Sequence, residues 1–319
     1  MERYLVTDSS VQKINKISAL CAIFAALCFS SNDVGIKFLS GAYALHQVVL
    51  LRTFFGVAFI LVLILPFNGG WRVVKTKRLK MHICRGLCVV FANMCFFLAL
   101  AKMQLADAVA ILFFSPLLIT IFSIIFLSEK VGRYRWSAIG VGLLGVLIIV
   151  RPGTSAFQVV SLLPLFAAFG YASFHTLTRK IGPTESAATL ALYIQLTFLV
   201  VCLLVGFFIG DGRYATRSDP SLMFLLRAWV WPAPSDIWIF LIVGAGSACG
   251  GFLISQAYRI SEAAFVAPFE YIAMPLAIFF GVIFFKEWPD PIAWSGIVLI
   301  VISGLFNLWR ETVRYIDIP

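Results

Sequence analysis

The stretch EKVGRYRWSAIGVGLLGV at residues 129–146 returns in altered form as EWPDPIAWSGIVLIVISG at residues 287–304. In both copies a glutamate is followed seven residues later by Trp-Ser and then by an apolar run that contains glycine. The two glutamates, Glu129 and Glu287, are 158 positions apart, and the Trp-Ser pairs keep the same offset. Alone this match could arise by chance, but together with a second match it predicts a chain built from two related halves.

A second match lies earlier in each half. DVGIK at residues 33–37 corresponds to HTLTR at residues 175–179, at an offset of 142. The sixteen-residue difference between the two offsets fits the long connection DGRYATRSDPSLMFLLRAWVWPAPSD at residues 211–236, which lengthens only the second half. We therefore expect two domains, a first repeat at residues 17–150 and a second repeat at residues 157–310.

The composition places both halves in a membrane. Hydrophobic residues make up 61% of the chain, charged residues make up 13%, and the mean hydropathy is +0.97. A soluble domain carries roughly 25% charged residues. Apolar runs of about 20 residues, enough to cross a hydrocarbon core of about 30 Å, recur along the chain. They predict ten spans, at residues 17–38, 46–66, 81–101, 105–127, 134–150, 157–178, 187–209, 235–257, 261–285 and 292–310.

The number of spans in each repeat decides the architecture. Because five is odd, the second copy enters the membrane upside down relative to the first. The predicted fold is therefore an all-α membrane protein with ten transmembrane helices, arranged as two inverted five-helix repeats. Inverted repeats are typical of secondary transporters, whose solute binds near the membrane midplane between the repeats. The loops are too short to hold a soluble catalytic domain.

Lysine and arginine set the expected orientation. With the N-terminus inside the cell, the cytoplasmic segments hold sixteen of the 25 Lys and Arg residues and the external segments hold seven. Both termini are therefore expected in the cytoplasm, and the first span is expected to be retained rather than cleaved as a signal. The net charge of +10 reflects this topology. The basic stretch WRVVKTKRLK at residues 71–80 favours contact with anionic lipid headgroups over contact with nucleic acid.

Several motifs, in their order along the chain, resemble a known family. They are LLRTFFG, ICRGLCVVFANMCFFLALAKMQLADAVAILFFSPLL, LSEKVGRYRWSAIGVGLLGVLIIVRPG, QAYRISEAAFVAPFEYIAMP and FKEWPDPIAWSGIVLIVISGL. Together they resemble the ten-helix branch of the drug/metabolite transporter superfamily, whose repeat is the EamA domain. The APFEY and EWPDP forms resemble a proteobacterial subgroup that includes carriers of riboflavin and of S-adenosylmethionine. The resemblance implies a bacterial inner-membrane protein in which helices one to four and six to nine surround a central cavity.

Glu270 is the polar residue that most needs an explanation. It lies about nine residues into an apolar span, between Pro268 and Pro275. An ionised carboxylate in hydrocarbon is unfavourable, so intramembrane acids usually face a cavity or a charged partner. Prolines loosen the helix, and the freed carbonyls can be satisfied by water in a cavity. We expect Glu270 to contact solute or proton, with a structural pair to Arg85 as the alternative.

Asp33 and Arg52 are expected at similar depths on the first two helices, which run antiparallel. An ion pair between them is geometrically reasonable, and it could serve structure, gating or direct contact with solute. Lys37 lies one turn beyond Asp33 and is expected to extend to the outer membrane interface. The sequence does not choose between a structural and a solute-binding role for the Asp33–Arg52 pair.

Further candidates follow from their positions within the spans. His175 and Tyr171 lie one turn apart on the sixth span, and Ser115 is near the repeat counterpart of Glu270. Polar packing remains the alternative for His175. The side chains that could line the cavity are Asn32, Asn93, Gln195 and Gln256, and those that could stack on a flat solute are Phe114, Phe269 and Tyr271.

These observations favour a secondary transporter of a small organic metabolite that works by alternating access. The charged and aromatic candidate residues suit a zwitterionic or aromatic solute. The sequence identifies neither the solute nor the direction of transport. A flippase of lipid-linked intermediates with the same fold is the alternative. A membrane-embedded enzyme fits less well, because the chain has three histidines and no HExxH or phosphate-binding glycine loop. We expect no cofactor, no metal and no nucleic-acid partner, and a monomer or weak homodimer surrounded by membrane lipid.

Overall fold

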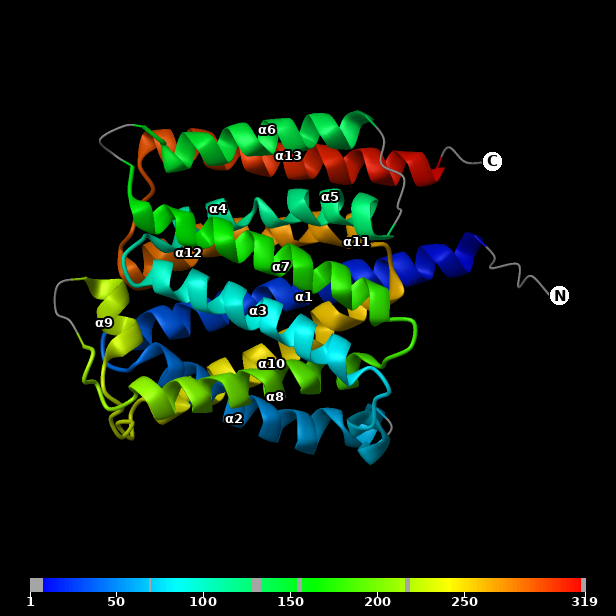
Figure 1. The fold of residues 1–319 in the computed structure, drawn as a ribbon. Coiled ribbons are helices and arrows are strands. Elements are labelled where there is room, and N and C mark those ends of the chain that lie inside the picture. The colour runs from blue at the N-terminus through cyan, green and yellow to red at the C-terminus, as the bar shows by residue number, and fades with distance from the viewer. Residues whose placement is uncertain (1–7, 69, 128–132, 154–156, 216–218, 317–319) are drawn as a thin grey trace.

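The structure is a computed structural model that describes residues 8–68, 70–127, 133–153, 157–215 and 219–316 (Figure 1). Among these residues every regular element is helical. The α-helices are α1 (Asp8–Leu39), α2 (Leu45–Phe59), α3 (Leu79–Leu100), α4 (Leu105–Leu112), α5 (Ser115–Leu127), α6 (Arg133–Val150), α7 (Leu162–Ile181), α8 (Ala187–Ile209), α9 (Pro220–Leu226), α10 (Ile237–Ile260), α11 (Ala263–Val266), α12 (Ala273–Phe285) and α13 (Pro291–Ile316). Short π- and 3-10 turns are η1 (Ile60–Ile64), η2 (Pro66–Asn68), η3 (Gly70–Val74), η4 (Val159–Ser161) and η5 (Ala267–Ile272).

The chain is a multi-pass membrane protein. Within the described residues, seven helices are long and apolar enough to cross a membrane, and three shorter apolar helices lie at Gly140–Val150, Phe269–Phe285 and Pro291–Ser303. Each of the ten predicted spans overlaps one of these segments. These three apolar segments are parts of α6, of the stretch from α11 to α12, and of α13, and ten complete crossings stay a prediction. Glu129, which anchors the sequence repeat, lies outside the described residues.

The helices lie side by side, and α1 begins and α13 finishes at the same end of the bundle (Figure 1). We call this end, where α1 begins and α13 finishes, the terminal end, and we call the opposite end, which carries α9, the α9 end. The main packing pairs are α1 with α10, α6 with α13, α3 with α7, α2 with α10, and α2 with α8. The α6–α13 pair forms a separate layer beyond α4 and α5 (Figure 1).

Two membrane helices are interrupted, one in each half of the chain. The first breaks between α4 and α5 at Phe113–Phe114, just before Pro116. The second breaks at η5, a 3-10 turn that has Pro268 at its start and contains Glu270. Proline has no backbone N–H to donate and disfavours a helical residue before it, which explains both breaks. Pro275 lies in the first turn of α12, where a missing N–H is tolerated, so it does not disrupt the helix.

Candidate functional site

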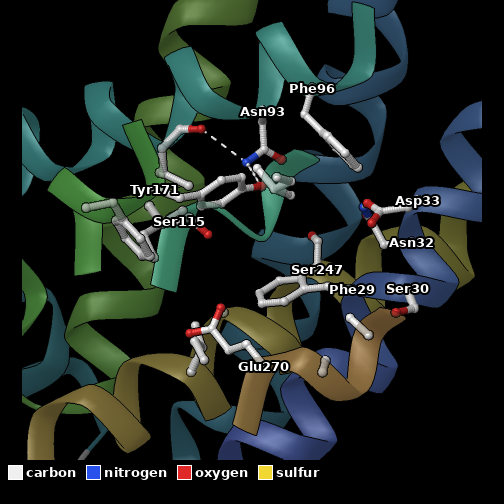
Figure 2. Close-up of a pocket in the computed structure, with 18 of the residues that line it drawn as sticks. Phe29, Ser30, Asn32, Asp33, Asn93, Phe96, Ser115, Tyr171, Ser247 and Glu270 are labelled. Carbon is white, nitrogen blue, oxygen red and sulfur yellow. Dashed lines mark hydrogen bonds between the residues drawn. The ribbon is translucent and has the colours of Figure 1, made fainter. Parts of the chain in front are cut away.

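A cavity lies in the interior of the bundle, next to both helix breaks. Its walls come from both halves of the chain, including α1 to α5 and α7, α8, α10 and η5. Nine of the residues predicted from the sequence line it, namely Asn32, Asp33, Arg52, Asn93, Ser115, Tyr171, His175, Gln195 and Glu270. Figure 2 labels six of them, Asn32, Asp33, Asn93, Ser115, Tyr171 and Glu270.

Glu270 reaches the cavity from the broken segment η5 and keeps 21% of its side chain exposed. The hydroxyl of Tyr258 donates a hydrogen bond to Glu270 Oε1. Nε2 of His175 lies 3.9 Å from Glu270 Oε2, and the His175 ring stacks on the ring of Tyr258 with centroids 4.2 Å apart. The carboxylate is therefore held on one side by Tyr258 and His175, and its remaining exposed surface is available to a solute.

Arg85, the alternative partner of Glu270, is occupied elsewhere. Its guanidinium donates to Thr178 Oγ1 at 3.0 Å and to the carbonyl of Leu190, and it lies 5.1 Å from the ring centroid of Phe174. The alternative interpretation of Glu270, a structural pair with Arg85, is therefore not what the structure has. Arg85 instead joins α3 to α7 and α8, since Thr178 and Leu190 belong to those helices.

Asp33 and Arg52 are joined through a third residue. Nη1 of Arg52 donates to Asn32 Oδ1 at 3.2 Å, and Asn32 Nδ2 donates to Asp33 Oδ1 at 3.2 Å. The direct ion pair expected from the sequence is thus replaced by an amide bridge. The Arg52 guanidinium also lies 5.4 Å from the ring centroid of Phe97 and 5.0 Å from that of Phe198, which suits a buried cation.

Neutral polar side chains also line the cavity, among apolar ones. Asn93 Nδ2 donates to the hydroxyl of Tyr171 at 2.7 Å, and Gln195 Nε2 donates to Ser247 Oγ at 3.0 Å. Figure 2 shows Asn93, Tyr171, Ser247 and Glu270 around one shared space. The cavity therefore offers amide and hydroxyl groups between a carboxylate at one side and the Asp33–Asn32–Arg52 chain at the other.

Four predicted site residues do not line the cavity. Phe114 lines a separate apolar groove together with Leu118. Tyr271 packs on Phe113 with ring centroids 5.0 Å apart. The other two are Phe269, which packs on Phe265, and Gln256, which accepts from Arg259 Nε at 3.1 Å. Neighbours in a helix differ in direction by about 100°, so residues next to Ser115 and Glu270 point elsewhere.

Sequence reasoning missed the aromatic wall and the partner of Glu270. The rings that line the cavity are Phe29, Phe96, Phe113, Phe174 and Phe198. Among these, Phe96 lies three residues after Asn93 and Phe29 lies four residues before Asp33, which are same-face spacings in a helix. These spacings could have identified both rings. No pattern marks Tyr258, because its contact with Glu270 depends on how α10 meets η5 in space.

Lys37 makes a contact that the sequence did not predict. Its side chain is only 9% exposed and its ammonium group pairs with Glu287 at 2.7 Å. Its ammonium group is therefore held by protein groups, and its expected place at the outer membrane interface stays a prediction. Within the part of the chain that the structure describes, no group of three His, Cys, Asp or Glu side chains is arranged to hold a metal ion.

Comparisons with known proteins agree with this arrangement. The sequence pattern of the EamA-like transporter family matches residues 16–151. A riboflavin transporter of Vibrio cholerae is 30% identical over 93% of this chain and 94% of its own length. An S-adenosylmethionine uptake transporter of Rickettsia prowazekii is 24% identical over 92% of this chain and 94% of its own. One crystal structure shares the fold with a TM-score of 0.63, covering 97% of this chain and 99% of its own at 18% identity.

The first relative decides the family, because the similarity runs through nearly the full length of both proteins. It confirms the resemblance noted in the sequence, and the relatives are named as transporters rather than enzymes. A multi-pass chain with a polar interior cavity is what such a function requires. The chain belongs to the EamA-like transporter family of the drug/metabolite transporter superfamily.

Proposed function

We propose that this protein is a secondary transporter that moves a small organic metabolite across the bacterial inner membrane by alternating access. The solute binds near the membrane midplane, in the cavity around Glu270. The single observation that carries the proposal is that cavity. Both halves of the chain line it, and the carboxylate of Glu270, whose side chain is 21% exposed, points into it. Family membership supports transport as the activity.

The helix packing supports ten crossings in two inverted repeats. If α1 to α6 and α7 to α13 are related copies, exchanging them converts the α1–α10 pair into the α7–α3 pair. Both of these pairs occur, and α2–α8 and α6–α13 convert into themselves. The interrupted helices α4–α5 and α11–α12 also correspond. Lysine and arginine counts support cytoplasmic termini, so that the terminal end faces the cytoplasm and the α9 end faces outward.

The cavity suits an aromatic or zwitterionic solute. Five phenylalanine rings provide flat apolar surface, Glu270 can meet a cationic or donor group, and the Asp33–Asn32–Arg52 chain can meet an acidic or acceptor group. Riboflavin and S-adenosylmethionine, for which two relatives are named, both contain a flat heteroaromatic ring and several polar groups. The protein is proposed to work as a monomer or weak homodimer.

Transport by the purified protein in lipid vesicles tests this function. Uptake of riboflavin, followed by its fluorescence, and of labelled S-adenosylmethionine is measured for the parent and for Glu270→Gln. The matched control is Glu262→Gln, the same substitution at an exposed position eight residues earlier. We expect Glu270→Gln to weaken solute binding if the carboxylate holds the solute. If it carries a proton instead, pH-driven accumulation should vanish while solute exchange survives.

Two results would contradict the proposal. If Glu270→Gln folds and transports like the parent from pH 5.5 to 8, Glu270 has no part in the mechanism. If the vesicles move no soluble solute but translocate lipid-linked sugars between leaflets, the protein is a flippase.

A further inference from the structure

Lys37, near the end of α1, makes three contacts with its ammonium group. It donates to both carboxylate oxygens of Glu287 at 2.7 Å and to the carbonyl of Met103 at 2.8 Å. It also lies 5.0 Å from the ring centroid of Phe285. Because the side chain is 9% exposed, these groups replace nearly all of its water. Lys37 is thereby fixed between the start of α4 and the end of α12.

Glu287 is turned toward Lys37 by the way α12 ends. Lys286 adopts a left-handed backbone conformation, with φ of 58°, and the N–H of Glu287 donates to the carbonyl of Gly281 at 3.0 Å. This closes the helix and directs the following side chain back across it. Glu287 Oε2 then accepts from the N–H of Leu105 at 3.0 Å, at the first residue of α4. One carboxylate of the second half thus holds α1 and α4 of the first half.

The contact lies just beyond the cavity on the side of the α9 end. Asp33, which lines the cavity, is one helical turn before Lys37 on α1. Val109, which also lines it, is one turn after Leu105 on α4. One turn corresponds to roughly 5.4 Å along the helix. Lys37 and Glu287 therefore join the two halves about one helical turn from the cavity, on the side of the α9 end.

We propose that the Lys37–Glu287 pair is the gate that closes the cavity toward the α9 end during transport. The proposal rests on the proposed function, because alternating access requires the two halves to separate at each end in turn. An ion pair that water can reach suits a contact that opens and closes repeatedly. Glu287 keeps 25% of its side chain exposed, so water can replace the pair when the halves part. A dry apolar contact could not exchange its partners in that way.

Labelling of a cysteine inside the cavity tests the gate without any solute. The seven native cysteines are replaced and Ser30→Cys is introduced, since Ser30 lines the cavity and is 5% exposed. A membrane-impermeant thiol reagent is applied to intact cells and to inside-out vesicles, which present opposite ends of the bundle. We expect Glu287→Gln to raise the labelling rate from the α9 end by about tenfold, by shifting the population toward the open state.

The matched control is Asp290→Asn. Asp290 lies three residues from Glu287 and is also ion-paired, but its partner Arg151 follows α6, away from the cavity. This control should leave the labelling rate unchanged. Lys37→Met should act like Glu287→Gln, and it covers the case in which Glu287→Gln does not fold. Exchanging the two charges, with Lys37→Glu and Glu287→Lys together, should restore much of the slow labelling.

The gate is wrong if Glu287→Gln and Lys37→Met both leave the labelling rate unchanged, or if Asp290→Asn raises it equally. Vesicle transport separates this failure from that of the proposed function. If labelling responds as expected but no solute is carried, the gate stands and the proposed function fails. If solute is carried but labelling does not respond, the transporter stands and its gate lies elsewhere.

Discussion

The two ends of the bundle close the cavity with different side chains. Toward the α9 end the buried core contains Ile36, Phe97, Leu100 and Leu105, each at most 2% exposed. Toward the terminal end the buried cluster mixes four alanines, Ala22, Ala25, Ala172 and Ala257, with the larger residues Ile119, Ile254, Tyr258, Phe265 and Val266. Large side chains interlock, whereas small ones let helices meet along smooth surfaces.

The two ends also differ in the polar contacts that join their helices. At the α9 end the interlocked core is reinforced by the Lys37–Glu287 pair and by the segment after α9. In that segment the Tyr43 hydroxyl donates to Asp236 at 2.6 Å and accepts from the N–H of Ala233 at 2.9 Å. The α9 end is thus joined by large buried side chains and by these polar contacts, and the terminal end is joined by the buried contacts of Arg85 with α7 and α8 and by the Tyr258–Glu270 hydrogen bond.

The largest expected effect is loss of a ring from the interlocked core. Phe97→Ala removes a side chain that is 1% exposed and that lies against Arg52. Such a deletion costs about 3–5 kcal/mol in the free energy of unfolding, through lost apolar burial and the cavity that remains. Thermal unfolding in detergent should show a larger drop in Tm for Phe97→Ala than for Phe265→Ala in the terminal-end cluster. Equal drops would remove the contrast between the ends.

The amide bridge between Asp33 and Arg52 should have an intermediate effect. Asn32→Ala leaves two buried charged groups without their shared partner, which costs about 1–3 kcal/mol. A double-mutant cycle of Asp33→Asn and Arg52→Gln, measured as Tm shifts, should show coupling in the parent. The coupling should shrink in the Asn32→Ala background. An unchanged coupling energy would mean that the two charges interact without the bridge.

Tyr258→Phe should destabilise the terminal end only slightly. It removes one hydrogen bond to Glu270 and keeps the ring stacked on His175, so the expected loss is about 0.5–1.5 kcal/mol. Solute affinity should change more than Tm does, because the carboxylate loses its positioning contact. Measuring both on the same preparation checks this, with Tyr214→Phe, an exposed tyrosine near the α9 end, as control. A large drop in Tm with unchanged affinity would make Tyr258 a packing residue only.

The smallest effect concerns acid stability at the α9 end. Hydrogen bonds from Lys102 and from the first N–H groups of α9 lower the pKa of Asp219. Because the pKa is lower in the folded state, this stabilisation is present above the unfolded value of about 3.9 and is lost as the pH falls through the folded value. The difference in Tm between the parent and Asp219→Asn should therefore shrink as the pH falls from 6 to 3. A difference independent of pH would exclude this contribution.

Sequence reasoning identified the helices well because membrane spans can be recognised in a sequence as long apolar runs. It also identified Glu270, Asp33 and Arg52, since charges are rare and conspicuous inside such runs. It failed where direction around a helix matters, as with Phe114 and Phe113, because nearly every face of these helices is apolar. It failed again where contacts join distant segments. The links Tyr258–Glu270 and Lys37–Glu287 exist only once the helices are packed.

The contact between α6 and α13 has a mechanical consequence. A Cβ atom on Gly145 would lie 2.7 Å from the carbonyl oxygen of Gly296, and one on Gly296 would lie 2.7 Å from that of Gly145. Main chain therefore lies against main chain here, beside the side chains of Ile149 and Ile300. In the proposed cycle such a contact serves as a fixed pivot far from the solute. Any side chain added at either glycine would shift the axis about which the halves rotate. It would thereby change how far the helices move at both ends of the bundle.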